Sequence, residues 1–314
     1  MEQIFKTRIV LYALAFFGLL LTSCSNDDDI TLSIPSISEV EIGSANRGVI
    51  GRDIHFNVEV LAGDMIDLVQ VNINPREEEN YTHDWSFEIA WDEFKGVKNA
   101  TVHKHFDVPE DAAEGKYDFI ITVTDENGTK LEEIFEVEII DPINLPVDPS
   151  VYLFAVEKID IDGNTGLANF YANGDFRNPD DKVFRENESI VSYTQINNVK
   201  DDGILYNLLI KKSLNHKPET VDDIDFSKAI VIDVLEHTNY EEVTSISTYF
   251  NPDVSIRDRP ALTIGALQDN NLPNPNSIDG DNVWESGTYY YGIVYTNTTH
   301  NLSVHHYIEF DIVF

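Results

Sequence analysis

The chain has 314 residues, with 21 lysines and arginines against 56 aspartates and glutamates, which gives a formal net charge of −35. A surface this acidic repels nucleic acid and anionic lipid, so nucleic-acid binding and peripheral attachment to a membrane surface are excluded. The hydrophobic fraction of 42% and the aromatic fraction of 11% are ordinary for a folded protein, so the charge does not predict disorder.

Residues 1–23 have the composition of a lipoprotein signal peptide. Lys6 and Arg8 form a basic start, and the apolar run at 9–21 is too short for a lasting membrane span. The sequence LTSC at 21–24 fits the bacterial lipobox, in which the cysteine thiol is acylated and its amine becomes the new N-terminus. We therefore predict that Cys24 is lipidated. The alternatives are an ordinary secretory signal or an N-terminal apolar helix.

Cys24 is the only cysteine, so the chain has neither a disulfide partner for it nor a second thiol for catalysis. Residues 24–33 form a polar tether that contains the acidic run Asp27–Asp29. Such a run resembles the export tag that sends Bacteroidetes lipoproteins to the outer face of the outer membrane. We predict an outer-membrane, lipid-anchored protein that faces the cell exterior; the alternative for this run is a solvated spacer.

The remaining chain is long enough for about two domains. Residues 141–149 contain three prolines, and because proline removes backbone donors and favours extended conformations, this segment predicts a semi-rigid linker. The domain boundaries expected from it are 34–140 and 150–314.

Alternation of apolar and polar residues predicts strands in the first domain, with one face buried and one face wet. The predicted strands are 37–42, 54–60, 69–73, 85–91, 100–108, 117–123 and 135–139. Asn127 and Gly128 predict a hairpin turn, and Trp85 and Trp91 fall on the core face. About seven strands over roughly one hundred residues predict an immunoglobulin-like β-sandwich without the cysteine pair of antibody domains.

Three segments of the first domain carry a family resemblance: HKHFDVPE at 103–110, EGKY at 114–117 and VTDENG at 123–128. In this combination they resemble a family of Bacteroidetes lipoproteins grouped as domain of unknown function 4625. The resemblance covers residues 34–140. It implies an immunoglobulin-like fold and a surface location, and it implies no particular activity.

The second domain is also rich in predicted strands, which gives an all-β protein of two sandwich domains. The strands expected are 151–159, 189–196, 204–210, 229–235, 243–250, 284–295 and 302–314. Residues 298–301 predict the turn of a terminal hairpin, residues 218–226 predict one short helical turn, and the polar stretches 160–188 and 251–283 predict long loops.

His103 and His105 give the sharpest chemical signal. Residues two apart in a strand point to the same side, and the apolar residues of this strand have the other parity, so both imidazoles face solvent. A separation of about 7 Å along the strand lets both reach one cation. His83 could add a further ligand, and imidazole favours zinc or copper. The alternative is an exposed pair with no metal. His305 and His306 are adjacent, face opposite sides, and are expected to be structural.

Calcium is less favoured than zinc or copper. The segment Asp160–Asn164 resembles the opening of a calcium loop, but Thr165 and Tyr171 occupy the positions where an EF-hand needs glycine and glutamate. Residues 279–282 form a second acidic turn. Both segments are explained by the turn preference of aspartate, asparagine and glycine.

Trp284 and Tyr290 are candidates for a ligand-binding platform, because aromatic rings stack on sugars; the alternative is that they are core aromatics. The sequence has no G-x-S-x-G, P-loop or H-E-x-x-H motif, so we name no catalytic residue and do not expect an enzyme.

These observations predict a non-enzymatic cell-surface lipoprotein whose immunoglobulin-like modules bind a ligand, with a divalent metal as one candidate. The alternatives are a glycan-binding accessory lipoprotein of an outer-membrane uptake system, with a TonB-type receptor or a glycan as partner, and an adhesin or structural subunit. No nucleic-acid partner is expected.

Overall fold

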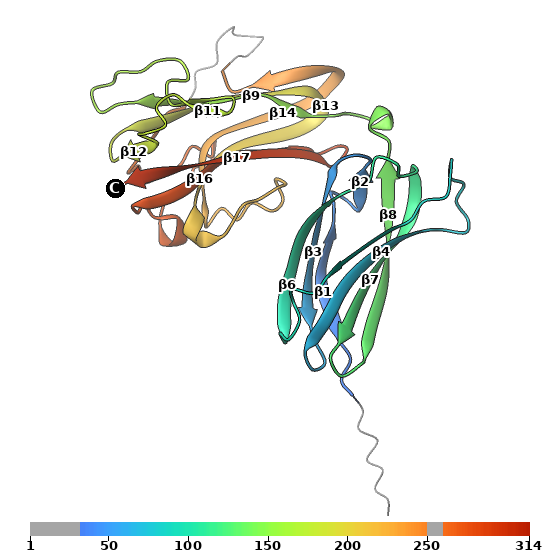
Figure 1. The fold of residues 1–314 in the computed structure, drawn as a ribbon. Helices are drawn as coiled ribbons and strands as arrows, with labels where there is room; N and C mark the ends of the chain where they lie inside the picture. Colours follow the sequence, from blue (N-terminus) through green and yellow to red (C-terminus); the bar gives the residue numbers. More distant parts are fainter. Residues whose placement is uncertain (1–31, 250–259) are drawn as a thin grey trace, which may run out of the picture.

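The computed structural model describes residues 32–249 and 260–314, which form two β-domains joined by residues 141–149 (Figure 1). The predicted signal peptide and Cys24 lie outside the described residues. The prediction of an all-β protein is confirmed, because the described elements are strands and three short 3₁₀ helices. Among these residues, no helix has the length and apolar character needed to span a membrane.

The first domain is a sandwich of a three-stranded and a five-stranded sheet. Their strand orders are β1-β3-β6 and β2-β8-β7-β4-β5. The strands are β1 (Ser36–Ile42), β2 (Arg47–Val49), β3 (Asp53–Leu61), β4 (Ile66–Pro75), β5 (Phe87–Trp91), β6 (Asn99–Asp107), β7 (Gly115–Asp125) and β8 (Lys130–Ile140). All seven predicted strands are present; β2, a three-residue parallel partner of β8, is additional.

The core of the first domain lies between the two sheets, as the alternation predicts. Phe56 of β3 and Phe119 of β7 are completely buried and touch across the sandwich, with ring centroids 5.6 Å apart. Trp91 stacks on Phe56 at 5.7 Å, and Trp85 is also buried, which confirms both tryptophans as core residues. Burial of such rings is the main stabilising contribution in a chain without disulfides.

The immunoglobulin-like character is visible in the strand order and in one tyrosine. Strands β1, β3 and β6 correspond to A, B and E of an immunoglobulin domain, and β4, β7 and β8 correspond to C, F and G. Tyr117, near the start of β7, is buried and donates a hydrogen bond to the carbonyl oxygen of Ala113 at 2.8 Å. This is the tyrosine corner of such sandwiches.

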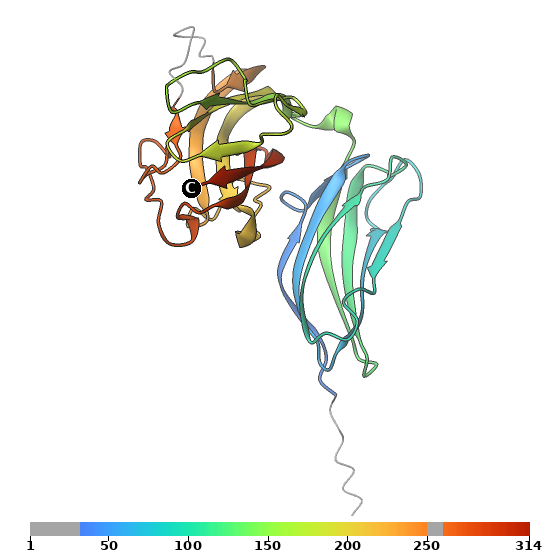
Figure 2. The same cartoon turned by 60° about the vertical axis from the view of Figure 1, so that its left-hand side comes forward.

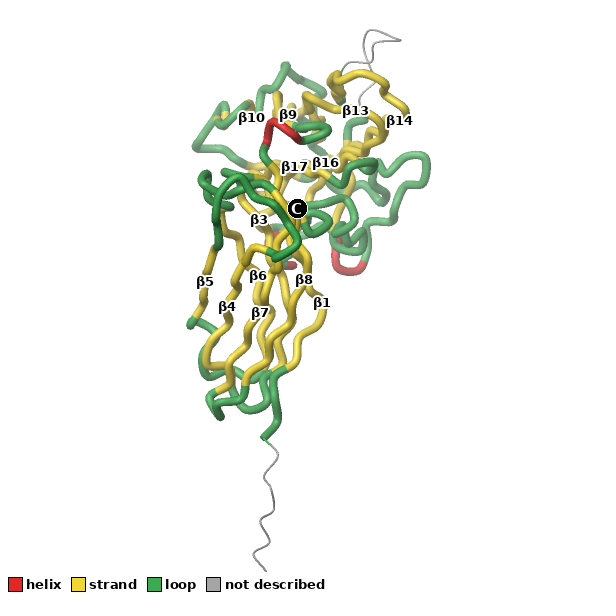
Figure 3. Tube along the Cα trace, turned by 90° about the vertical axis from the view of Figure 1, so that its right-hand side faces the viewer, coloured by secondary structure: helices red, strands yellow, loops and turns green. Residues whose placement is uncertain are grey.

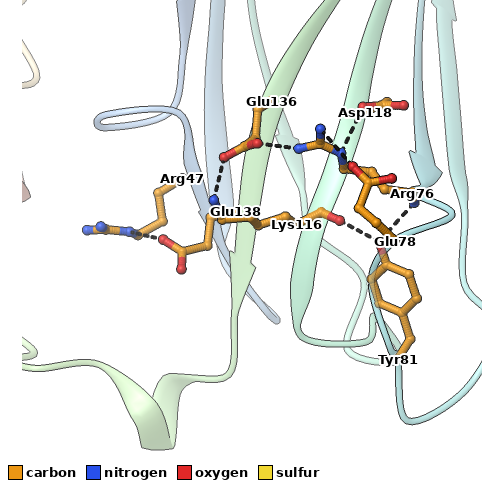
Figure 4. Close-up of polar contacts among 8 residues, drawn as sticks. All are labelled: Arg47, Arg76, Glu78, Tyr81, Lys116, Asp118, Glu136 and Glu138. Carbon is orange, nitrogen blue, oxygen red and sulfur yellow. Dashed lines mark hydrogen bonds and ion pairs between the residues drawn. The ribbon is translucent and has the colours of Figure 1, made fainter.

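Charged side chains cover the outer face of the five-stranded sheet. Arg76 pairs with Glu78, Asp118 and Glu136, and Lys116 reaches the same Glu136 (Figure 4). Exposed pairs of this kind add little stability individually. They occupy the face of the domain opposite to the outer face of β1-β3-β6.

The second domain is one nine-stranded sheet that folds back on itself into two layers (Figures 1 and 2). Its long strands are β9 (Ser150–Ile159), β13 (Ser189–Lys211), β14 (Ala229–Ser247), β16 (Gly287–Asn297) and β17 (Leu302–Val313). The short ones are β10 (Tyr171–Ala172), β11 (Asp175–Phe176), β12 (Val183–Arg185) and β15 (Leu262–Thr263). The turn at 298–301 joins β16 to β17, as predicted.

Strand β13 connects the two layers. Its first part, residues 189–197, pairs with β9, whereas its second part, residues 203–211, pairs with β16. The sequence analysis predicted separate strands at 189–196 and 204–210, and two more at 229–235 and 243–250. This division is wrong, because the structure has one long strand, β13, in place of the first pair and one long strand, β14, in place of the second. The polar stretch between the halves of β13 contains Asn198 and Asp201 at positive φ and shifts the register against β14, so it bends the strand and does not end it.

Two further predictions for the second domain need correction. Residues 218–226 form turns and not a helix, because the carboxylates of Asp223 and Asp225 accept the backbone N–H groups of Thr220 and Ser227. The 3₁₀ turn lies earlier, at Lys212–Leu214. The segments expected as plain loops contain the four short strands and the 3₁₀ turn Gly280–Asn282.

Candidate metal centre

Three histidines lie on the outer face of the three-stranded sheet of the first domain. Strands β3 and β6 are antiparallel neighbours, and their register places His55 directly opposite His105 and diagonal to His103. The imidazole centroids of His55 lie 4.8 Å from His103 and 5.3 Å from His105. His103 and His105 share the solvent-facing side, as their spacing predicts, and His55 joins them from the neighbouring strand.

The second domain contributes Glu219 to the same place. This residue lies in the connection between β13 and β14, which extends toward the first domain in Figure 1 and brings Glu219 to His55 and His105. Figure 3 shows the second domain lying at one end of the first sandwich. The connection is held on both sides of Glu219. Tyr307 donates a hydrogen bond to the carbonyl oxygen of Pro218, and the N–H of Val221 donates to Thr296. Glu219 is therefore presented by a braced loop.

His55, His103, His105 and Glu219 form a four-residue cluster, called here the His₃Glu cluster. One potential ligand atom from each residue lies within 4.8 Å of all the others. Glu219 is 3.0 Å from His105 Nε2 through Oε1 and 3.3 Å from His55 Nδ1 through Oε2. Despite this closeness, the buried Nδ1 atom of His55 has no hydrogen bond within the described residues. Such a nitrogen is available for another partner.

Two more carboxylates occupy the far sides of the imidazoles. Asp53 lies 2.6 Å from His105 Nδ1, and Glu41 lies 3.3 Å from His55 Nε2. An imidazole that donates one N–H to a carboxylate keeps the lone pair of its other nitrogen free and aimed at the centre. In His105 the nitrogen opposite the carboxylate is Nε2, and in His55 it is Nδ1. Both are the atoms that face Glu219.

Charges within the cluster shift the pKa values of Glu219 and His55. Burial alone would raise the pKa of Glu219, but its contact with His55 and the charges of His305, His105 and His55 outweigh burial and lower the pKa to about 2. Burial alone would lower the pKa of His55, but Glu219 and Glu41 raise it above its ordinary value. Glu219 is therefore an ionised carboxylate at any physiological pH.

His103 differs from His55 because no carboxylate contacts its ring within the described residues. Burial and the charges of His55 and His105 lower the pKa of His103 below its ordinary value. A neutral imidazole is the form that coordinates a metal ion. The cluster thus offers three imidazole nitrogens and one carboxylate oxygen, which is a donor set for a transition metal.

The His₃Glu cluster lies beside a cleft of about 520 Å³ between the two domains, and His55 and Glu219 form part of the cleft wall. Its other lining residues include Glu41, Asp222 and His305. The carboxylates give this wall a negative potential, which attracts cations. The cleft therefore supplies an entry path for an ion.

His83, predicted as a further ligand, is not in the cluster. Its Nε2 lies 2.9 Å from the carbonyl oxygen of Asp111 and its Nδ1 lies 3.0 Å from the Thr82 hydroxyl, so both ring nitrogens are occupied elsewhere. The structure therefore places His83 apart from His103 and His105, in the loop before β5. His305, expected to be structural, lies beside the cluster on β17 and interacts with the backbone of Glu219.

The two aromatic residues predicted to bind a ligand, Trp284 and Tyr290, differ in their burial. Trp284 is only 6% exposed and its indole N–H donates to the carbonyl oxygen of Ala266, so it has no free ring face for a sugar. This corrects the expectation of Trp284 as a platform and favours its alternative, a core aromatic. Tyr290 is half-buried, with Lys212 over its ring. Its role as a ligand-binding residue stays a prediction.

The acidic turn at 160–164 is closed on itself. The Asp160 carboxylate accepts the backbone N–H groups of Asp162 and Asn164 and the side-chain amide of Asn164. Hydrogen bonds from Asn164 lower the pKa of Asp160. These bonds explain the segment as a turn without any ion.

Sequence reasoning missed two members of the cluster. His55 was recognisable as a wet-face residue of its strand, but only the pairing of β3 with β6 brings it to His103 and His105. Glu219 has no signal in the sequence, because it is one carboxylate in a polar loop more than one hundred residues away.

No curated protein matches the chain. Among solved structures, it is similar to dimeric latent PorU from Porphyromonas gingivalis, with 12% identity, coverage of 92% of this chain and 21% of that chain, and a TM-score of 0.30. It is also similar to native E. coli alpha-2-macroglobulin, with 8% identity, coverage of 87% and 16%, and a TM-score of 0.27. The chain thus spans about a fifth of the length of PorU. Residues 22–140, which contain the whole first sandwich, match the family model described as Domain of unknown function (DUF4625), as the resemblance predicted.

Proposed function

We propose that this protein is a non-enzymatic, lipid-anchored surface protein that binds a divalent transition metal through the His₃Glu cluster. The observation that carries the proposal is the convergence of His55, His103, His105 and Glu219 within 4.8 Å of one another. Glu41 and Asp53 support it, because each occupies the outward nitrogen of a ligand histidine.

The donor set favours zinc or copper over calcium or magnesium. Imidazole suits zinc, copper and nickel, whereas calcium and magnesium prefer an all-oxygen shell. Three nitrogens and one carboxylate oxygen match the four ligands of a tetrahedral zinc site. We take zinc as the first metal to test and copper as the second.

The geometry requires only small movements. Tetrahedral ligands about 2.0–2.2 Å from zinc lie roughly 3.3–3.6 Å from one another. Glu219 already lies 3.0 Å from His105 and 3.3 Å from His55, and no pair in the cluster exceeds 4.8 Å. Side-chain shifts of about 1 Å would complete the shell.

Isothermal titration of the purified two-domain chain with zinc and with copper tests this function. We expect one site per chain and a loss of affinity of at least about tenfold in His103→Ala, because the variant removes a ligand from the metal. Asp222→Asn is the matched control, since it removes one charge from the same cleft without removing a ligand. Absence of binding by either metal would refute the proposal.

The location is a separate part of the proposal. The lipobox at Cys24 and the acidic run after it support an outer-membrane anchor. Metabolic labelling with a radioactive fatty acid would mark the wild-type protein, and Cys24→Ala should lose the label. Retention of the label in that variant would contradict lipidation at Cys24.

A further inference from the structure

We propose that a metal ion in the His₃Glu cluster joins the two domains and fixes their relative orientation, an inference that rests on the proposed metal-binding function. Three cluster members come from one sheet of the first domain, and Glu219 comes from the second domain. An ion bound by all four would therefore link domains that the chain otherwise connects through residues 141–149.

The interface around the cluster is polar. Each hydrophobic cluster in the described ranges draws its residues from one domain only. Besides the contacts of Glu219 with His55 and His105, two hydrogen bonds reach a turn of the second domain: Ser44 donates to the carbonyl oxygen of Asn301, and Arg47 donates to that of His300. Domains joined by a polar interface of this kind are expected to move relative to one another unless something ties them.

The linker is held to the first domain at two points, because Asn144 donates a hydrogen bond to Glu114 and Arg52 donates to Asp148. Strand β8 ends at Ile140 and β9 begins at Ser150, and the 3₁₀ turn Pro142–Asn144 lies between them. On the first-domain side, Arg52 forms a two-pronged pair with Asp148 in the linker at 2.7 and 2.8 Å. This pair holds the end of the linker to the first domain and does not cross to the second sandwich.

Glu219 is held rigidly to the second domain, so a metal ion bound to it would be held to that domain as well. The hydrogen bonds at Pro218 and Val221 brace its loop against β16 and β17 of the second domain. On the other side, His55 and His105 belong to paired strands whose inner faces place Phe56, Val58 and Val102 in the core. A metal–ligand bond between two rigid supports restricts both rotation and separation of the domains.

Pulsed dipolar spectroscopy tests this inference. Cys24 is the only cysteine, so a soluble chain with Cys24 removed can carry two spin labels at introduced cysteines. Glu133→Cys on β8 and Glu241→Cys on β14 place one label on an exposed position of each domain. We expect a broad distance distribution after chelation and a single narrow one with zinc.

The variant Glu219→Ala distinguishes metal binding from the joining of the two domains. Its three histidines should still bind zinc, with an affinity lower by roughly tenfold or more, while the distance distribution stays broad at saturating zinc. Asp222→Ala, which changes a residue of the same loop, is the control: its distance distribution should narrow with zinc as that of the wild type does. The proposal that the metal joins the domains is refuted if zinc binds but leaves the wild-type distance distribution unchanged, or if zinc narrows the distribution of Glu219→Ala equally. The proposed metal site is not affected by either result. If zinc does not bind, the proposed function itself has failed.

Discussion

Asp53→Asn tests whether the carboxylates behind the histidines prepare them for a metal. Asp53 lies 2.6 Å from His105 Nδ1, so its carboxylate is placed to accept the N–H of Nδ1 when Nε2, on the side of Glu219, binds a metal ion. Asparagine has nearly the same shape but no charge, and its amide can donate to Nδ1, which favours the wrong tautomer. Changes of this type lower metal affinity by roughly 10–100-fold, or about 1.4–2.7 kcal/mol of binding free energy.

The assay is titration of zinc into the wild type and the variant at one pH. Folding should be nearly unaffected, because the Asp53 side chain is 53% exposed and an exposed pair of this kind contributes about 1 kcal/mol or less. Asp107→Asn is the control, since Asp107 is an exposed carboxylate directly opposite Asp53 on the paired strand. Wild-type affinity in Asp53→Asn, or an equal loss in both variants, would refute the reasoning.

Three further outcomes are expected. The pKa of His55 is raised above its ordinary 6.5, so zinc affinity should fall as pH is lowered through that pKa, by about tenfold per pH unit for each proton displaced. In the zinc-free protein, the stability linked to this proton is fully present below pH 6.5 and is lost as pH rises through the raised pKa. Calorimetry at several pH values measures the affinity and thermal melts measure the stability; a zinc affinity that does not change with pH would contradict the first expectation. Tyr117→Phe should destabilise the first domain by about 1–3 kcal/mol, because the buried carbonyl of Ala113 loses its donor; urea unfolding followed by tryptophan fluorescence measures this, and an unchanged midpoint would count against the tyrosine corner. His83→Ala should bind zinc like the wild type in the same titration, since both ring nitrogens of His83 are engaged away from the cluster; a weakened site would show that His83 participates.

Local pattern was sufficient for much of the first domain. Alternation predicted its main strands, because each strand buries one face and one face only, and the same parity placed His103 and His105 together on the outer face. In the second domain the pattern was less informative. The halves of β13 were predicted as separate strands, since a polar bend looks like a strand end when the pairing partner is unknown.

What the sequence determined by itself was therefore the class of fold, the family resemblance of the first domain and two of the four cluster residues. The tertiary structure decided the rest of the cluster. His55 reaches His105 only because β3 and β6, far apart in the chain, are antiparallel neighbours in one sheet. Glu219 reaches them only because the second domain folds back against that sheet. Such contacts depend on strand register and domain placement, which are set by packing over the whole chain and leave no local pattern.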